Sequence, residues 1–158
     1  MERVEYHIEI DRPVEDVYDQ WTKFEAFPEF MPGVKAVEQL DDTHVRWHVD
    51  LWGRRESWNA EITEQQPDRR ISWKSISGAW SAGTVRFEPL SAFRSCVRVA
   101  MAYQPRGAIE KAGDALGLVD SQVQRALNRF KQFVESRPTP TGGWRGEVNQ
   151  SASQGQPL

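Results

Sequence analysis

The feature that most constrains this chain is a long apolar stripe between Ala108 and Glu135. Its apolar residues recur at spacings of three and four, which is typical of one face of an α-helix. The stripe consists of Ile109, Ala112, Gly113, Leu116, Val119, Val123, Leu127, Phe130 and Val134. A helix of this length measures about 42 Å, enough to cross a small domain. Apolar groups from the rest of the chain must cover such a stripe.

The preceding residues can supply that cover. From Val4 to Ile10, apolar and polar residues alternate, which predicts a strand with one buried face. Two short helices are expected next, one beginning at Pro13 and one ending at Gly33. From Val34 to Tyr103, apolar and polar residues alternate again, in segments separated by residues typical of turns. This pattern predicts six antiparallel strands in a meander.

The expected order is therefore strand, two short helices, six strands and one long helix. A curved seven-stranded antiparallel sheet wrapped around the long helix buries both apolar faces, which makes the fold class α+β. We expect residues 1–136 to form a single domain. Residues 137–158 are rich in Pro, Gly, Ser and Gln, and they contain too few apolar groups to order themselves. A flexible tail is expected there.

Composition argues against several classes of function. The net charge is −3 and the basic residues form no clustered face, so no nucleic-acid partner is expected. No apolar run approaches the ~20 residues of a membrane span, and the first residues lack a signal-peptide core. The one cysteine, Cys96, forms no internal disulfide and fits a reducing compartment. We expect a cytoplasmic protein that is a monomer or a homodimer.

The histidines do not suggest a metal site. His7, His44 and His48 are the only three, and all have the outward parity of their strands. On one strand, His44 and His48 would lie roughly 13 Å apart, too far to share one ion. No metal and no other cofactor is expected.

Four stretches give this chain its resemblance to a known superfamily: Asp11–Tyr18, Phe27–Val34, Ile62–Trp73 and Gly83–Leu90. With this element order, the chain resembles the START-like helix-grip (START/Bet v 1-like) superfamily. It is most similar to the bacterial polyketide cyclase/dehydrase and coenzyme-Q-binding branch. The resemblance implies a cavity between sheet and long helix that takes a hydrophobic small molecule. Members bind polyketides, sterols, lipids or quinones, and some cyclise and dehydrate aromatic polyketides.

Large inward-facing side chains outline the predicted cavity. Trp47, Trp58 and Trp73 come from neighbouring strands, so their rings should meet on one face. Gly113 and Gly117 in the predicted helix indicate a close approach or open space, because an interior Gly costs ~1 kcal/mol against Ala. The aromatic segment from Phe24 to Met31 would form part of the mouth. The predicted ligand-binding set is Phe27, Phe30, Trp47, Trp58, Trp73, Ser75, Phe87, Met101, Tyr103, Leu116, Val119, Asp120 and Val123.

Binding and catalysis remain open as alternatives. A binding protein would sequester or present a lipid-, quinone- or polyketide-like ligand and needs only shape and apolar surface. A cyclase/dehydrase would also need an acid or base within ~3 Å of the reacting atom, for which Glu56, Tyr103 and Asp120 are the candidates. A protein-interaction module is a third class that the resemblance permits. We place binding first, because every feature found serves burial.

In the cyclising members, a pocket arginine is thought to orient the substrate. Arg46, Arg86 and Arg98 have outward parity on their strands, and Arg54 alone has inward parity, at the end of a hairpin. The sequence therefore departs from the expectation for a cyclase at this point.

Overall fold

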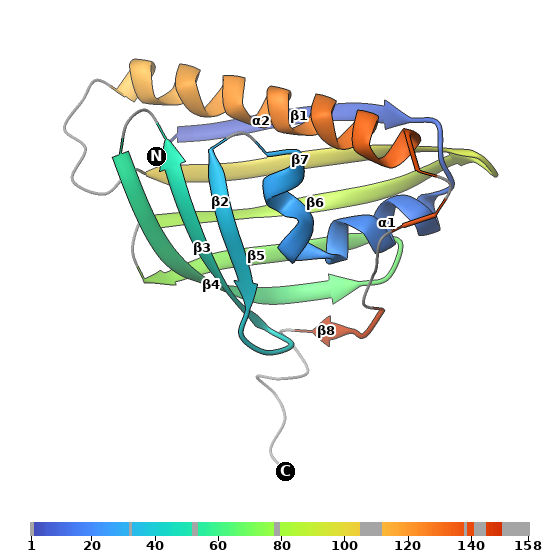
Figure 1. The fold of residues 1–158 in the computed structure, drawn as a ribbon, viewed down its shortest axis with the longest axis horizontal. Helices are drawn as coiled ribbons and strands as arrows, with labels where there is room; N and C mark the ends of the chain where they lie inside the picture. The colour runs from blue at the N-terminus through green and yellow to red at the C-terminus, as the bar shows by residue number, and fades with distance from the viewer. Residues whose placement is uncertain are drawn as a thin grey trace, which may run out of the picture.

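A curved antiparallel sheet dominates the computed structural model (Figure 1). The structure describes residues 2–31, 33–51, 54–77, 80–104, 112–137, 139–140 and 145–149, with the backbone alone at 2, 51, 54, 103–104, 112–119 and 149. The seven long strands are β1 (Glu2–Ile10), β2 (Val34–Gln39), β3 (His44–Leu51), β4 (Arg54–Gln66), β5 (Arg70–Ser77), β6 (Trp80–Ser91) and β7 (Arg94–Gln104). Their order in the sheet is β1-β7-β6-β5-β4-β3-β2. The predicted meander is confirmed, and β1 joins it at the β7 edge.

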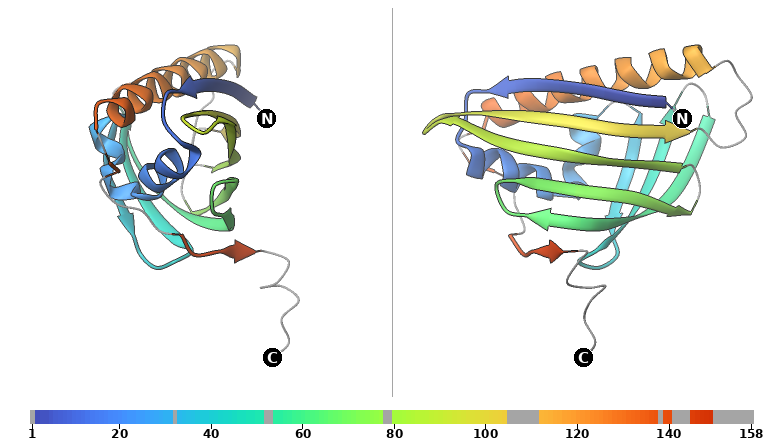
Figure 2. Two further views of the ribbon diagram at one scale, coloured as in Figure 1. Left: turned by 90° about the vertical axis from the view of Figure 1, so that its right-hand side faces the viewer. Right: turned by 180° about the vertical axis from the view of Figure 1, so that it is seen from behind.

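Three helices complete the fold of the described residues. Two short ones follow β1, namely α1 (Val14–Thr22) and the 3₁₀ helix η1 (Phe24–Glu29). The long helix α2 (Ala112–Glu135) crosses the open side of the curved sheet alongside β1 (Figures 1 and 2). The α+β helix-grip architecture expected from the sequence is confirmed. The predicted first turn of the long helix, residues 108–111, lies outside the described residues.

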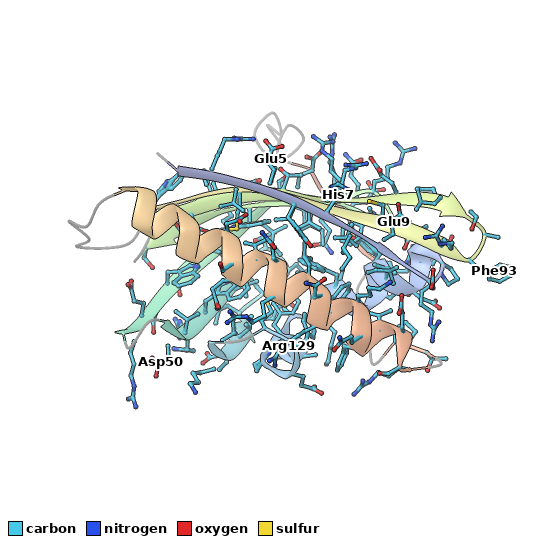
Figure 3. The ribbon with its side chains drawn as sticks, turned by 90° about the horizontal axis from the view of Figure 1, so that it is seen from above. Glu5, His7, Glu9, Asp50, Phe93 and Arg129 are labelled. Carbon is cyan, nitrogen blue, oxygen red and sulfur yellow. The ribbon has the colours of Figure 1, made fainter. Side chains whose placement is uncertain are left out.

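Strand alternation explains which face of the sheet is buried. On β4, the apolar residues Trp58, Ala60 and Ile62 are buried, while Asn59 and Glu61 between them are only partly covered. On β1, the side chains of Glu5, His7 and Glu9 project away from α2 (Figure 3). The period of two therefore separates an apolar inner face from a polar outer face.

Aromatic rings pack one end of the interior tightly. Phe130 of α2 lies 5.0 Å, centroid to centroid, from both Trp21 of α1 and Phe30. Phe133 lies 5.2 Å from Phe30. The C-terminal half of α2 is thus held by the two short helices.

Polar contacts fix the same end of α2 to the end of β1 and the turn that follows it. The backbone N–H of Asp11 donates to Glu135 Oε2 at 2.8 Å. Lys131 Nζ donates to the Glu9 carbonyl at 2.8 Å and to Glu135 Oε2 at 2.7 Å. These bonds satisfy backbone groups where the chain leaves β1.

Part of the C-terminal segment is ordered against the sheet, which differs from the expectation for residues 137–158. The short strand β8 (Val148–Asn149) pairs with β4 at Gln65 and Glu64. Arg145 contacts Asp19 of α1 and the Asp68 carboxylate. The pairing of β3 with β4 ends at Glu61, so one edge of β4 is open there. That open edge and the two carboxylates explain why a polar segment docks.

Candidate functional site

A cavity of about 210 Å³ lies between the inner face of the sheet and α2. All but two of its described lining residues are apolar or aromatic. Its walls come from α1, η1, the strands β2 to β7 and the middle of α2. The lining consists of Trp21, Phe24, Phe27, Met31, Val34, Val45, Trp47, Val49, Trp58, Ala60, Ile62, Ile71, Trp73, Ser81, Val85, Val99, Met101, Gln122, Val123, Ala126 and Leu127.

Stacked rings form one flat wall. Trp47 and Trp58 are direct cross-strand partners of β3 and β4. Their rings lie 5.9 Å apart with an interplanar angle of 12°. Phe27 of η1 packs against Trp47 at 5.5 Å. This wall offers a flat surface against which a planar ligand could stack.

The third indole is accommodated by a glycine. Trp73 of β5 and Gly83 of β6 are cross-strand partners. A Cβ atom at Gly83 would lie 2.8 Å from Trp73 Cη2 and 2.7 Å from the Ala100 carbonyl oxygen. Gly83 is therefore required for the Trp73 ring to lie this close to β6.

Only two polar side chains other than the indoles line the described walls, Ser81 and Gln122. Trp73 Nε1–H donates to Ser81 Oγ at 3.2 Å, and the Ser81 backbone N–H donates to Ser75 Oγ at 3.0 Å. Gln122 Oε1 accepts from Arg125 at 3.3 Å. None of the described lining side chains is ionisable. A charged ligand would lose its hydration there without gaining a counter-charge.

The structure brings six of the predicted ligand-binding residues to the cavity wall. They are Phe27, Trp47, Trp58, Trp73, Met101 and Val123. Phe30 and Phe87 lie instead in the adjoining aromatic core, where Phe87 packs against Tyr18 at 5.2 Å. Ser75 is not among the described lining residues, and its Oγ accepts a hydrogen bond from the Ser81 backbone N–H. The side chains of Tyr103, Leu116 and Val119 lie outside the described part of the chain.

Of the three candidate acids and bases, the two whose side chains the structure describes, Glu56 and Asp120, lie off the cavity lining. Asp120 does not line the cavity and accepts a hydrogen bond from Gln124 at 2.8 Å. Glu56 is half-buried and also lies off the lining. Backbone register places Tyr103 of β7 opposite Ser81 of β6. The described side chains thus present no acid–base pair to the cavity.

Several lining residues were absent from the predicted set. Val45, Val49, Ala60, Ile62, Val85 and Val99 share the inward parity of the predicted residues. Ser81 shares the parity of Gly83, Val85 and Phe87, so extending that alternation by one step would have found it. The sequence around Gln122 and Ala126 does not identify them as lining residues. Whether they reach the cavity depends on where α2 crosses the sheet.

The described residues form neither a metal-binding cluster nor a reactive cysteine site. The described part of the chain holds no group of three or more His, Cys, Asp or Glu side chains able to bind a metal ion. Cys96 is 1% exposed, and burial raises the pKa of its thiol, which disfavours a nucleophilic thiolate. No helix within the described ranges is long and apolar enough to cross a membrane.

An outward-facing cluster contains a serine, a histidine and a carboxylate. His48 Nδ1 lies 3.0 Å from Ser57 Oγ, and His48 Nε2 lies 3.0 Å from Glu38 Oε2. These residues come from three paired strands. The cluster lies on the opposite face from the cavity.

The geometry of a sheet closed by a long helix over an apolar cavity agrees with the sequence comparison. The profile of the polyketide cyclase / dehydrase and lipid transport family matches residues 10–132. The chain belongs to this family. A relative from Streptomyces lincolnensis is 45% identical over 149 residues, which cover 94% of this chain and 99% of the relative. It is an uncharacterized 17.2 kDa protein from the melC2-rnhH intergenic region.

Solved structures show the same fold for this family member. A START superfamily protein from Mycobacterium smegmatis has a TM-score of 0.78 at 14% identity and covers 86% of this chain and 99% of its own. The Zhui aromatase/cyclase from Streptomyces sp. R1128 has a TM-score of 0.71 at 21% identity, covering 90% and 98%. A Deinococcus radiodurans protein has a TM-score of 0.68 at 29% identity, covering 86% and 98%.

Proposed function

We propose that this protein binds a neutral, largely apolar small molecule in the cavity between the sheet and α2. The observation that carries the proposal is a cavity of about 210 Å³ whose described lining has no ionisable side chain. Pockets for small molecules are typically apolar and aromatic with a few placed polar groups. Family membership supports the same class of ligand.

The volume limits the size of the enclosed group. An engineered apolar cavity of roughly 150 Å³ holds benzene, and pockets for drug-sized ligands span about 300–1,000 Å³. A cavity of about 210 Å³ suits one or two fused rings. A longer lipid- or polyketide-like molecule would place only one such portion inside.

Calorimetric titration with naphthalene and with naphthalene-1-sulfonate tests the proposal. We expect naphthalene to bind and the sulfonate to bind at least tenfold more weakly, because the described lining offers the anion no partner. The indole N–H signals of Trp47, Trp58 and Trp73 in ¹H–¹⁵N spectra should shift on binding. Absence of both heat and shifts with naphthalene would contradict the proposal.

A filled cavity provides the matched control. Ala126 lines the cavity from α2, so Ala126→Phe should occupy the ligand space and abolish binding. Asn128 is exposed on the same helix, so Asn128→Phe adds the same ring outside and should leave binding unchanged. Equal binding by both variants would place the ligand elsewhere.

Cyclase/dehydrase activity is the alternative that the family name supports. Such an activity needs an acid or base near the reacting atom. If the protein only binds, Tyr103→Phe and Asp120→Asn should change affinity by no more than about 0.5–1.5 kcal/mol. Turnover of a polyketide-like substrate that falls ~10²–10⁴-fold in either variant, with affinity intact, would favour the enzyme.

A further inference from the structure

Among the sheet residues that the structure describes, Ser81 is the one polar side chain, apart from the indoles, that lines the cavity. It lies near the start of β6, is 3% exposed and lines the wall beside Trp73. Its backbone is held in place, because its N–H donates to Ser75 Oγ at 3.0 Å. The position of the hydroxyl group is therefore set by the sheet.

The hydrogen bonds of this hydroxyl group leave its proton available. An indole N–H is a donor only, so in the 3.2 Å contact with Trp73 Nε1 the Ser81 oxygen must accept. A serine hydroxyl carries one proton of its own besides its two lone pairs. Among the residues that the structure describes, none accepts that proton. A buried donor without an acceptor is unfavourable, so this hydroxyl group favours an incoming ligand that can accept its proton.

The rest of the described lining supplies no competing charge. Gln122, the other polar residue, already accepts from Arg125, and the rest of the described lining is apolar or indole. A carboxylate or phosphate at Ser81 would receive one neutral hydrogen bond and no counter-ion, which does not offset the loss of its hydration. A neutral oxygen has a far smaller hydration to lose.

We propose that Ser81 is the polar subsite of the cavity, and that it donates a hydrogen bond to a neutral acceptor oxygen, a ketone or quinone carbonyl, on an otherwise apolar ring ligand. This inference rests on the proposed function and adds the chemical class of the ligand. Trp73 determines the direction of the hydrogen bond between Ser81 and the ligand. Its N–H donates to a lone pair of the Ser81 oxygen, so the Ser81 proton is left to be donated to the ligand.

The contribution of the ligand carbonyl group can be measured by comparing the binding of two bicyclic compounds, 1-tetralone and tetralin. The two share one skeleton and differ by a ketone in place of a methylene. The quantity measured is the ratio of the dissociation constants, tetralin over 1-tetralone, in wild type and in Ser81→Ala. We expect the ratio to fall about three- to tenfold in the variant, as for loss of one hydrogen bond. Any change in the cavity that weakens the binding of both ligands equally cancels in this ratio.

Ser72→Ala is the matched control variant. Ser72 lies on neighbouring β5 and bonds to Thr84 Oγ1 at 2.9 Å, away from the cavity lining. The ratio should be unchanged in this variant. A direct readout uses 1-tetralone labelled with ¹³C at the carbonyl, whose infrared stretch should lie at lower frequency when bound to wild type than when bound to Ser81→Ala.

The outcomes separate this inference from the proposed function. If tetralin binds but the ratio and the carbonyl frequency are the same in wild type and Ser81→Ala, the Ser81 subsite is wrong and apolar binding stands. If neither ligand binds wild type, both proposals fail. A fall in the ratio confined to Ser81→Ala, with a native ¹H–¹⁵N spectrum for that variant, supports the subsite.

Discussion

Gly83 shows how much a single methyl group can matter in this cavity wall. A Cβ atom there would approach the Ala100 carbonyl, Met101 Cβ and Trp73 Cη2 to within 2.7–2.8 Å. Two of these neighbours belong to the adjacent strand and cannot move alone. We expect Gly83→Ala to lower the free energy of unfolding by about 1–3 kcal/mol, measured by urea denaturation, and to shift the Trp73 indole signal.

A second substitution tests the cause. Trp73→Phe shortens the ring that faces Gly83, so part of the loss in Gly83→Ala should be recovered in the double variant. The recovery should be incomplete, because the contacts with β7 remain. Strictly additive free energies would show that Trp73 plays no part in the strain.

Tyr18 links stability to alkaline pH. Burial raises the pKa of Tyr18 from its ordinary value of 10.0 to about 12, while the neighbouring Gln65 amide and the Arg145 cation partly oppose the shift. A raised pKa means that the folded state keeps its proton after the unfolded chain has lost it. The corresponding stability is fully present below pH 10 and is lost as the pH rises towards 12.

We expect a loss of roughly 2–3 kcal/mol in the free energy of unfolding from this group over that range. Tyr18→Phe has no phenol to ionise, so its stability should fall less steeply. Urea denaturation of both proteins at each pH makes the contributions of all other titrating groups cancel. Parallel curves above pH 10 would contradict the assignment.

At the scale of the elements, α2 depends on its C-terminal half for anchoring. Phe130 is 0% exposed and packs edge-on against Trp21. Phe130→Ala should lower the free energy of unfolding by about 3–5 kcal/mol, as is typical of a deleted core ring. Arg129 is exposed on the same turn, and Arg129→Ala should change it by about 0.5 kcal/mol or less. Similar losses in both variants would contradict this account of the anchor.

The docked C-terminal segment is a second element whose contribution can be measured. Arg145 lies between Asp19 and Asp68, and burial raises the pKa of Asp19 despite that cation. Arg145→Gln leaves two carboxylates facing each other and should cost about 1 kcal/mol of unfolding free energy at neutral pH. The loss of unfolding free energy should be smaller in the double variant Asp19→Asn/Arg145→Gln, because one of the two carboxylates is then neutral. An unchanged stability in the single variant would mean that the segment is not held by charge.

The elements differ in how far the sequence could predict them. The alternation on β3 and β4 predicts that Trp47 and Trp58 face inward, and the stripe on α2 predicts the burial of Phe130. The alternation of a strand predicts which residues face inward, but not how much of the interior α1 fills. It therefore could not distinguish Phe87, which packs in the core, from Trp73, which lines the cavity. The two-residue β8 has no periodicity, and its docking depends on an edge of β4 that only the register of β3 leaves open.

At the scale of the whole molecule, the interior has two unlike ends. Trp21, Phe30, Phe130 and Phe133 fill one end with rings in mutual contact. Beside it, the stacked Trp47–Trp58 pair and Ser81 border open space. A filled aromatic end supplies rigidity, so the open part can keep its shape without a ligand.

The pairing of β1 with β7 also has a consequence for the synthesis of the chain. Ile10 pairs with Ser95 and Glu2 with Tyr103, and the backbone N–H of Asp11, in the turn after β1, is bonded to Glu135. On a ribosome that adds about 5–20 residues per second, β1 waits on the order of 5–20 s for its partner strand to be made. The strands β2 to β6 can pair with their neighbours as they emerge, but the barrel-like wall cannot close until β7 follows. During that interval the apolar face of β1 is open to chaperones and to other nascent chains, and long-range closure of this kind makes folding slow.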